Sequence, residues 1–268
     1  INTKYPELSR LTEPVRASPD GGANKLNNPF SPSLFLFGKQ HIEYDRTAVG
    51  MLALKWVISN NYEQFVANQT PAKRLSRESF KELREATLGL IKKNRLEALV
   101  ASLAINDLGK VTSFVKEVET RSNNKEIDHD NILLEALRKY PELIPSFQKL
   151  SDDDKQIIVK GMSAQFNLGQ FVQAENLPAN LVGLKKLSQE ELEFNHFHIL
   201  YDVAGALGHV SSNGSLLLNE PTYQFFSIAL QSIKKLSDKS LMEVYEDYLN
   251  ARAALWGKGP IKNNNDRA

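Results

Sequence analysis

Apolar residues recur at intervals of three or four along most of the chain, which is the spacing of one buried face of an α-helix. Val49, Leu52 and Trp56 follow this spacing, and we predict a helix from His41 to Asn60 around them. The same pattern predicts further helices over 76–93, Leu96–Ile105, 111–121, 129–140, 152–166, 189–209, 220–235 and 238–255. Alternating apolar and polar positions, which indicate strands, are nearly absent. The pattern therefore predicts an all-α fold.

Three of these helices are expected to begin at a serine whose hydroxyl accepts from the free amides of the first turn. Ser76 precedes the helix over 76–93. Ser151 and Ser188 are each followed three positions later by an acid, which matches the capping box.

The two ends of the chain lack the helical pattern. Five prolines and a Gly21-Gly22 pair interrupt residues 1–40, which we expect to form an irregular N-terminal arm. The apolar cluster from Leu34 to Phe37 is expected to pin this arm to the core. Residues 257–268 are expected to form a polar tail. No linker divides residues 41–256, so we predict a single helical domain between arm and tail.

Composition excludes several classes of protein. The 268 residues are 41% hydrophobic and 24% charged, as in ordinary globular proteins, and no apolar run is long enough to span a membrane. A net charge of +1 and dispersed basic residues argue against nucleic acid as the main partner. The absence of cysteine excludes thiolate chemistry but leaves the compartment open. Because Ile1 is not Met, we expect that a leader was removed or that a longer protein was trimmed.

The most specific segment runs from Asn106 to Lys110 at the end of an apolar helix. A carboxylate such as Asp107 is expensive to bury there unless a positive charge, either a metal ion or a cationic side chain, meets it. Gly109 allows the helix to stop, and Lys110 can then turn back toward Asp107. The alternative is an ordinary helix end, where glycine and lysine are both common.

Histidines supply the other candidates. His198 precedes Asp202 by four residues, so both project from the same helix face. Such a pair can provide two metal ligands, or one ligand and the carboxylate that orients it. His129 lies between two aspartates, and His41 is followed by two acids within four residues. The alternative for each of them is a surface pair or a helix cap.

The sequence Asn106-Asp107-Leu108-Gly109-Lys110 resembles the His-Asp-x-Gly-Lys motif of the HD-domain superfamily, which consists of metal-dependent phosphohydrolases and phosphodiesterases with an all-α fold. Asn106 departs from the motif, because it stands where the family has the His of the His-Asp pair. An amide oxygen is a weaker transition-metal ligand than imidazole, so the oxygen-rich ligand set favours Mg²⁺ or Mn²⁺ over Zn²⁺.

The resemblance implies a divalent metal ion (Mn, Mg, Fe or Zn) whose ligands would be His41, Asp107, His129 and Asp202. Lys110 would neutralise charge on a phosphate, and His198 or His196 would protonate the leaving oxygen or add a ligand. The implied activity is metal-dependent hydrolysis of a phosphate ester, such as a nucleotide or another small phosphorylated molecule. Two alternatives stay open: an inactive HD-like protein that binds a ligand, and an all-α interaction protein without a metal.

A polar loop between two predicted helices offers candidates for substrate binding. Gln170 and Gln173 can bond a base or a sugar, and Phe171 offers a stacking face. The alternative is that these amides bond only to neighbouring backbone, which is common in such loops.

Overall fold

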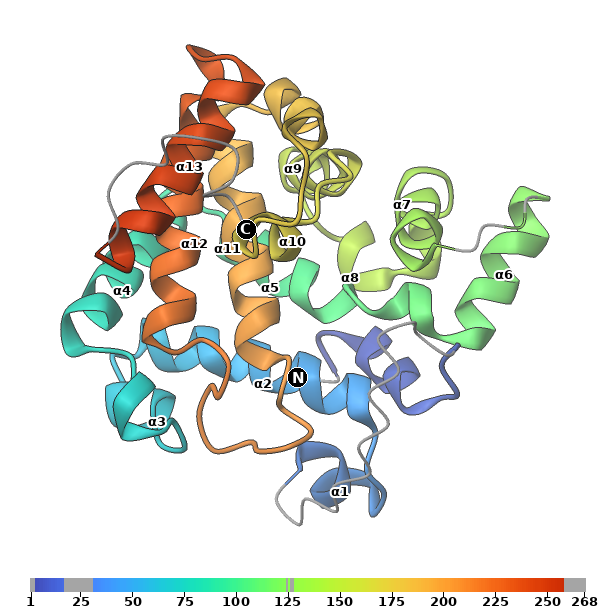
Figure 1. The fold of residues 1–268 in the computed structure, drawn as a ribbon. Coiled ribbons are helices and arrows are strands. Elements are labelled where there is room, and N and C mark those ends of the chain that lie inside the picture. The colour runs from blue at the N-terminus through green and yellow to red at the C-terminus, as the bar shows by residue number, and fades with distance from the viewer. Residues whose placement is uncertain (1–2, 17–30, 124, 126–127, 258–268) are drawn as a thin grey trace.

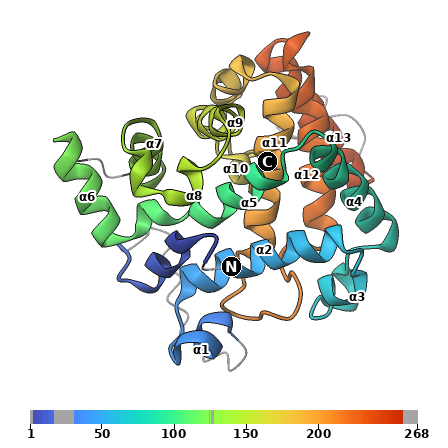
Figure 2. The same ribbon diagram turned by 180° about the vertical axis from the view of Figure 1, so that it is seen from behind.

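The computed structural model describes residues 3–16, 31–123, 125 and 128–257. It is about 71% helical, and in these residues β-pairing is limited to one isolated bridge between Val15 and Val111. The all-α prediction is confirmed (Figures 1 and 2). The α-helices are α1 (Pro32–Phe37), α2 (Ile42–Ile58), α3 (Tyr62–Phe65), α4 (Arg77–Lys92), α5 (Leu96–Ile105), α6 (Thr112–Ser122), α7 (His129–Lys139), α8 (Pro145–Gln148), α9 (Asp152–Ser163), α10 (Leu168–Val172), α11 (Gln189–Gly205), α12 (Glu220–Ile233) and α13 (Leu241–Leu255).

Short 3₁₀ helices connect several of these elements. They are η1 (Pro6–Thr12), η2 (Pro71–Lys73), η3 (Leu108–Lys110), η4 (Pro141–Leu143), η5 (Pro178–Val182), η6 (Leu184–Lys186) and η7 (Lys234–Ser237). Each of the nine helices expected from the apolar spacing is present, with ends shifted by a few residues.

Helix α11 lies at the centre of the fold and crosses α2, its most extensive neighbour (Figure 1). Three glycines let the two backbones touch. A Cβ atom on Gly50 would lie 2.7 Å from the carbonyl oxygen of Tyr201, and one on Gly205 would lie 2.2 Å from that of Arg46. A Cβ atom on Gly208 would lie 2.4 Å from the carbonyl oxygen of Asp45. No larger residue fits at these positions without separating the helices.

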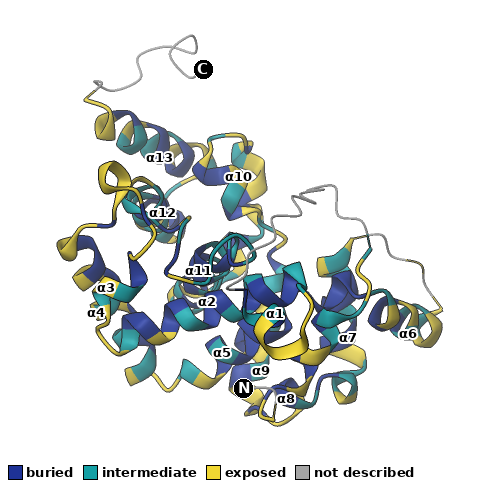
Figure 3. Cartoon of the chain, turned by 90° about the horizontal axis from the view of Figure 1, so that it is seen from below, coloured by how far each residue is buried: buried dark blue, intermediate teal, exposed yellow. Residues whose placement is uncertain are grey.

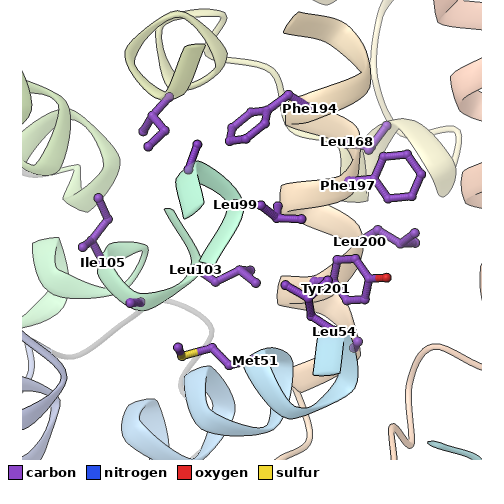
Figure 4. Packing of buried hydrophobic residues seen from close by; sticks show 14 of the residues in the cluster. Met51, Leu54, Leu99, Leu103, Ile105, Leu168, Phe194, Phe197, Leu200 and Tyr201 are labelled. Carbon is purple, nitrogen blue, oxygen red and sulfur yellow. The ribbon is translucent and has the colours of Figure 1, made fainter. Parts of the chain in front are cut away.

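The core surrounds α11 on several sides. Phe194, Phe197 and Leu200 of this helix are buried, and Leu99 of α5 and Met51 of α2 belong to the same hydrophobic cluster (Figure 4). Tyr201, also fully buried, pairs its hydroxyl with that of Thr87 in α4 at 2.7 Å. Because α11 runs through the core, polar residues on it that are shielded from solvent, such as His198 and Asp202, are candidates for function.

The predicted serine caps are present. The hydroxyls of Ser76, Ser151 and Ser188 each accept from the amide three residues on. Of these three serines, Ser188 alone forms the complete capping box, because Glu191 reaches back to its amide. The acid expected to do this for Ser151 is Asp154, whose carboxylate instead pairs with Arg95 at 2.8 Å.

The described part of the N-terminal arm packs into the core. Tyr5, Leu8 and Leu11 are buried in the main cluster, and η1 and α1 give the arm regular structure that its prolines did not suggest. The expectation that residues 34–37 pin the arm is wrong for Phe35, which is 87% exposed, and for Leu36. Figure 3 shows that α1 is exposed along part of its length. The predicted tail lies outside the described residues beyond Gly257.

Membrane crossing requires a long apolar helix. Among the residues that the structure describes, no helix has the length and hydropathy for it.

Candidate functional site

A cavity of about 620 Å³, here called the central cavity, opens where six elements meet. Helices α2, α5, α7, α9, α10 and α11, with the adjoining segments, supply its walls. Its charged and histidine residues are Arg46, Asp107, Lys110, Asp128, His129, Asp130, His198 and Asp202. Five carboxamides add to them: Asn106, Asn131, Gln165, Asn167 and Asn195.

The base of the central cavity is a buried ion-pair cluster. Asp107, just after α5, accepts from the ammonium of Lys110 at 2.7 Å, and the same ammonium lies 3.1 Å from Oε2 of Glu43. Arg46, one turn along α2, places Nη1 3.5 Å from that oxygen. All three members of the Asp107–Lys110–Glu43 group are buried. The positive charge that Asp107 needs is thus supplied by the chain itself.

Electrostatic interactions within the cluster determine which of its side chains are charged. Burial opposes ionisation of Asp107, but Lys110 and Arg46 outweigh it and hold the pKa of Asp107 below its usual value. Burial likewise opposes the charge of Lys110, yet Asp107 and Glu43 raise its pKa. Burial and the neighbouring Asp107 raise the pKa of Glu43. Lys110 and Asp107 are therefore a charged pair, with Glu43 the more easily protonated acid.

Gly109 serves a different purpose from the one expected. Its φ is not positive, so the end of α5 does not require glycine. A Cβ atom here would lie 1.9 Å from the carbonyl oxygen of His129, so glycine lets the start of α7 approach the base of the cavity.

Asp202 is the least stabilised carboxyl of the central cavity. Its Oδ1 accepts from Nδ2 of Asn106 at 3.2 Å, and no contact with a cationic side chain is recorded among the described residues. Burial and the nearby negative charge of Asp107 raise the pKa of Asp202 to about 7. The group therefore changes charge near neutral pH.

His198 lies one turn before Asp202 and is held at both ring nitrogens. Nε2 is 3.1 Å from Oδ1 of Asn106, and Nδ1 is 2.9 Å from the hydroxyl of Ser102. Burial lowers the pKa of His198 to about 4, so the ring is neutral at physiological pH. Asn106 thus bridges the two members of the i, i+4 pair.

The four ligands implied by the HD resemblance do not gather around one point. Asp107, His129 and Asp202 line the central cavity, but His41 does not. The ring of His41 packs edge-on against Phe37, with centroids 6.2 Å apart.

Within the described residues, one group of three or more metal-ligating side chains has its ligand atoms within 4.8 Å of one another: Asp128, His129 and Asp130. The implied set therefore does not fit a shared ion, since Lys110 already occupies Asp107.

The other predicted residues lie off the cavity. Nε2 of Gln173 donates to the carbonyl of Gly169 at 3.2 Å, which fits the local-backbone alternative. Gln170 is exposed, and neither glutamine lines the cavity; Asn167, Leu168 and Gly169 do. His196 is buried against Phe226 on another face of α11, with burial lowering its pKa to about 3.

Two contributors to the site were not expected from the sequence: Glu43 and Arg46. Both lie on the predicted helix from His41 to Asn60, one turn apart. The available signal is a group of three charged residues, Glu43, Asp45 and Arg46, at the start of a helix that is otherwise largely apolar.

Comparison with known proteins places the whole chain in one family. Residues 1–268 match the family of unknown function DUF6829, and the chain belongs to it. No curated protein and no solved structure is significantly similar to it.

Proposed function

We propose that the central cavity binds a small polar molecule carrying a positively charged group, and that Asp202 receives that group. The observation that supports this is the charge of the lining, which contains four aspartates against one arginine and one lysine. Lys110 and Arg46 are already engaged by Asp107 and Glu43. Among the described residues, the one hydrogen-bond partner of the Asp202 carboxylate is the amide of Asn106. A carboxylate in such surroundings gains most from a cationic partner.

The rest of the lining suits a polar ligand body. Carboxamides offer both donors and acceptors, and Phe166 adds an apolar face among them. Nε2 of Gln165 donates to Oδ1 of Asn131 at 3.0 Å. Within the described residues, the side chain of Asn195 makes no hydrogen bond and is open to a ligand. A cavity of about 620 Å³ is within the usual range for small-molecule sites.

The test is thermal denaturation with a panel of small polyamines, guanidinium compounds, amino sugars and nucleotide phosphates at pH 6 and pH 8. Cationic compounds are expected to raise Tm, more at pH 8 because Asp202 is then ionised. The gain should disappear in Asp202→Asn and persist in Asp153→Asn, an exposed acid of α9 outside the cavity lining. A Tm gain only from phosphates, or one unchanged in Asp202→Asn, would contradict the proposal.

A second candidate is a divalent cation at Asp128, His129 and Asp130, supported by the spacing of their ligand atoms. Hydrolysis of a phosphate ester remains a prediction that depends on such an ion. Metal analysis after purification without a His-tag, followed by Mn²⁺ titration, tests it. Roughly one bound equivalent, lost in His129→Ala and retained in Asp107→Asn, is expected if this group binds a metal ion. If the protein takes up no Mn²⁺, both the metal site and the metal-dependent hydrolysis are contradicted.

A further inference from the structure

A continuous chain of polar contacts links the central cavity to the interior of α5. It runs from Asp202 through the amide of Asn106 to the ring of His198, then to the hydroxyl of Ser102. The three links measure 3.2 Å, 3.1 Å and 2.9 Å. The Ser102 hydroxyl also lies 2.9 Å from the carbonyl oxygen of Leu99.

There are too few protons in this chain for every contact to be a hydrogen bond at the same time. Each group must therefore act as donor in some contacts and as acceptor in others. A neutral imidazole carries one N–H, so one ring nitrogen of His198 donates and the other accepts. If Nε2 donates to the oxygen of Asn106, then Nδ1 must accept from Ser102. The single hydroxyl proton of Ser102 is then unavailable to Leu99.

Turning the Asn106 amide over gives a second complete arrangement with the same heavy-atom positions, since the amide oxygen and nitrogen are nearly equal in size. The nitrogen of Asn106 then donates to Nε2 of His198, and Nδ1 donates to Ser102. Ser102 in turn donates to the carbonyl of Leu99. The oxygen of Asn106 now faces Asp202, which must carry a proton to donate to it.

We propose that Asp202, Asn106, His198 and Ser102 form a two-state relay, in which protonation of Asp202 turns over the Asn106 amide and changes the tautomer of His198. Ionised Asp202 goes with the Nε2–H ring, and protonated Asp202 goes with the Nδ1–H ring. The two states differ by one proton, which Asp202 carries in the protonated state and has released in the ionised state. The ring loses a proton at Nε2 and gains one at Nδ1 by exchange with solvent, so it stays neutral.

Charged groups from each neighbouring element set the balance between the two states. Asp107 and Glu43 favour the protonated form of Asp202, and Arg46 and Lys110 favour the ionised form. His198 lies on the same helix, and Asp128, His129 and Asp130 of the α7 start line the same cavity. The pKa of Asp202 near 7 makes both states accessible at physiological pH. If the cavity takes a cationic ligand, as proposed above, that ligand would select the Nε2–H state.

The experiment reads the tautomer directly in the free protein. Two-bond ¹H–¹⁵N spectra of protein labelled in its histidine rings distinguish protonated from bare ring nitrogens. The His198 signals are assigned by their loss in His198→Gln, and the Asp202 carboxyl is followed by ¹³C. As the pH rises from 5.5 to 8.5, we expect His198 to change from the Nδ1–H to the Nε2–H form. The pH midpoint of this change should equal the midpoint of the Asp202 carboxyl titration.

Two variants make the result specific. Asp202→Asn is close to isosteric and cannot ionise, so His198 should keep one tautomer throughout, while the other four histidine rings report an intact fold. Asp153→Asn, which removes an exposed acid of α9 outside the cavity lining, should leave the switch unchanged.

The proposal is overturned if wild-type His198 keeps one tautomer while Asp202 titrates, if the ring becomes doubly protonated near neutral pH, or if Asp202→Asn still switches. Because no ligand is present, the result is independent of whether cationic compounds bind.

Discussion

Replacing Asp202 by Asn should stabilise the protein at alkaline pH and do so progressively less as the pH falls. The substitution keeps the size of the side chain and its contact with Asn106 but removes a carboxyl that folding leaves poorly stabilised. In the folded chain its pKa is about 7, against 3.8 for an unperturbed carboxyl. The folded state therefore binds more protons than the unfolded state between these values, and the wild type loses stability as pH rises through this window.

The size of the effect follows from the same two values. Ionising Asp202 in the fold costs at most roughly 4 kcal/mol, since each pKa unit corresponds to about 1.4 kcal/mol. At pH 8 the full cost applies, and at pH 5 about 1.6 kcal/mol remains because the unfolded chain is still ionised there. The advantage of Asp202→Asn should therefore shrink by up to about 3 kcal/mol between pH 8 and pH 5, or about 6–12 °C in Tm.

Urea unfolding followed by circular dichroism at pH 5, 6, 7 and 8 measures this difference. Comparing variant with wild type at each pH cancels the titration of distant groups. Asp153→Asn is the matched control and should show no such trend. A difference between Asp202→Asn and wild type that stays constant across the range would refute the reasoning, because it would mean that Asp202 ionises normally in the fold.

Three further predictions concern the framework of the site. Gly205→Ala should cost about 2–4 kcal/mol by separating α2 from α11, whereas Gly89→Ala, with open space around its Cβ position, should be neutral or stabilising; denaturant midpoints compare them. Lys110→Met should cost about 3–5 kcal/mol by leaving Asp107 buried without a counter-charge, and adding Asp107→Asn should restore part of it, as a double-mutant cycle will report. His196→Leu should reduce the loss of stability below pH 6.5. The pKa of His196 is about 3 in the fold and 6.5 for an unperturbed ring, so as the pH falls the ring gains a proton in the unfolded chain but not in the folded one. Tm measured from pH 7 to pH 4 tests this, and a profile identical to that of the wild type would contradict it.

The helices were predictable because apolar spacing is a local property, and their ends were less so. The helix expected over 152–166 stops at Ser163, because Gln165 adopts a left-handed φ of 48°. Helices α3, α8 and α10 have four or five residues, too few to show a period.

The candidate site also combines local contacts, which the sequence could predict, with contacts that tertiary packing creates. Lys110 turns back to Asp107 within three residues, so the sequence could propose the pair, and it also proposed Asp202 and His198 from their helical spacing. Glu43 and Arg46 come from a helix more than sixty positions earlier, and only tertiary packing brings them to Asp107. The prediction of His41 rests on its residue type alone, and the structure places it before α2, facing Phe37 rather than the cavity.

The glycine-lined crossing of α2 and α11 gives the central cavity one stiff wall and one compliant wall. Where backbone meets backbone, no side chain can change rotamer to absorb a displacement, so Arg46 and Asp202 keep a nearly fixed separation. The opposite wall is built from the first turn of α7 and the five-residue helix α10. Widening that admits a ligand is therefore expected at α7 and α10, whereas α2 and α11 fix the place where Asp202 receives the charged group of the ligand.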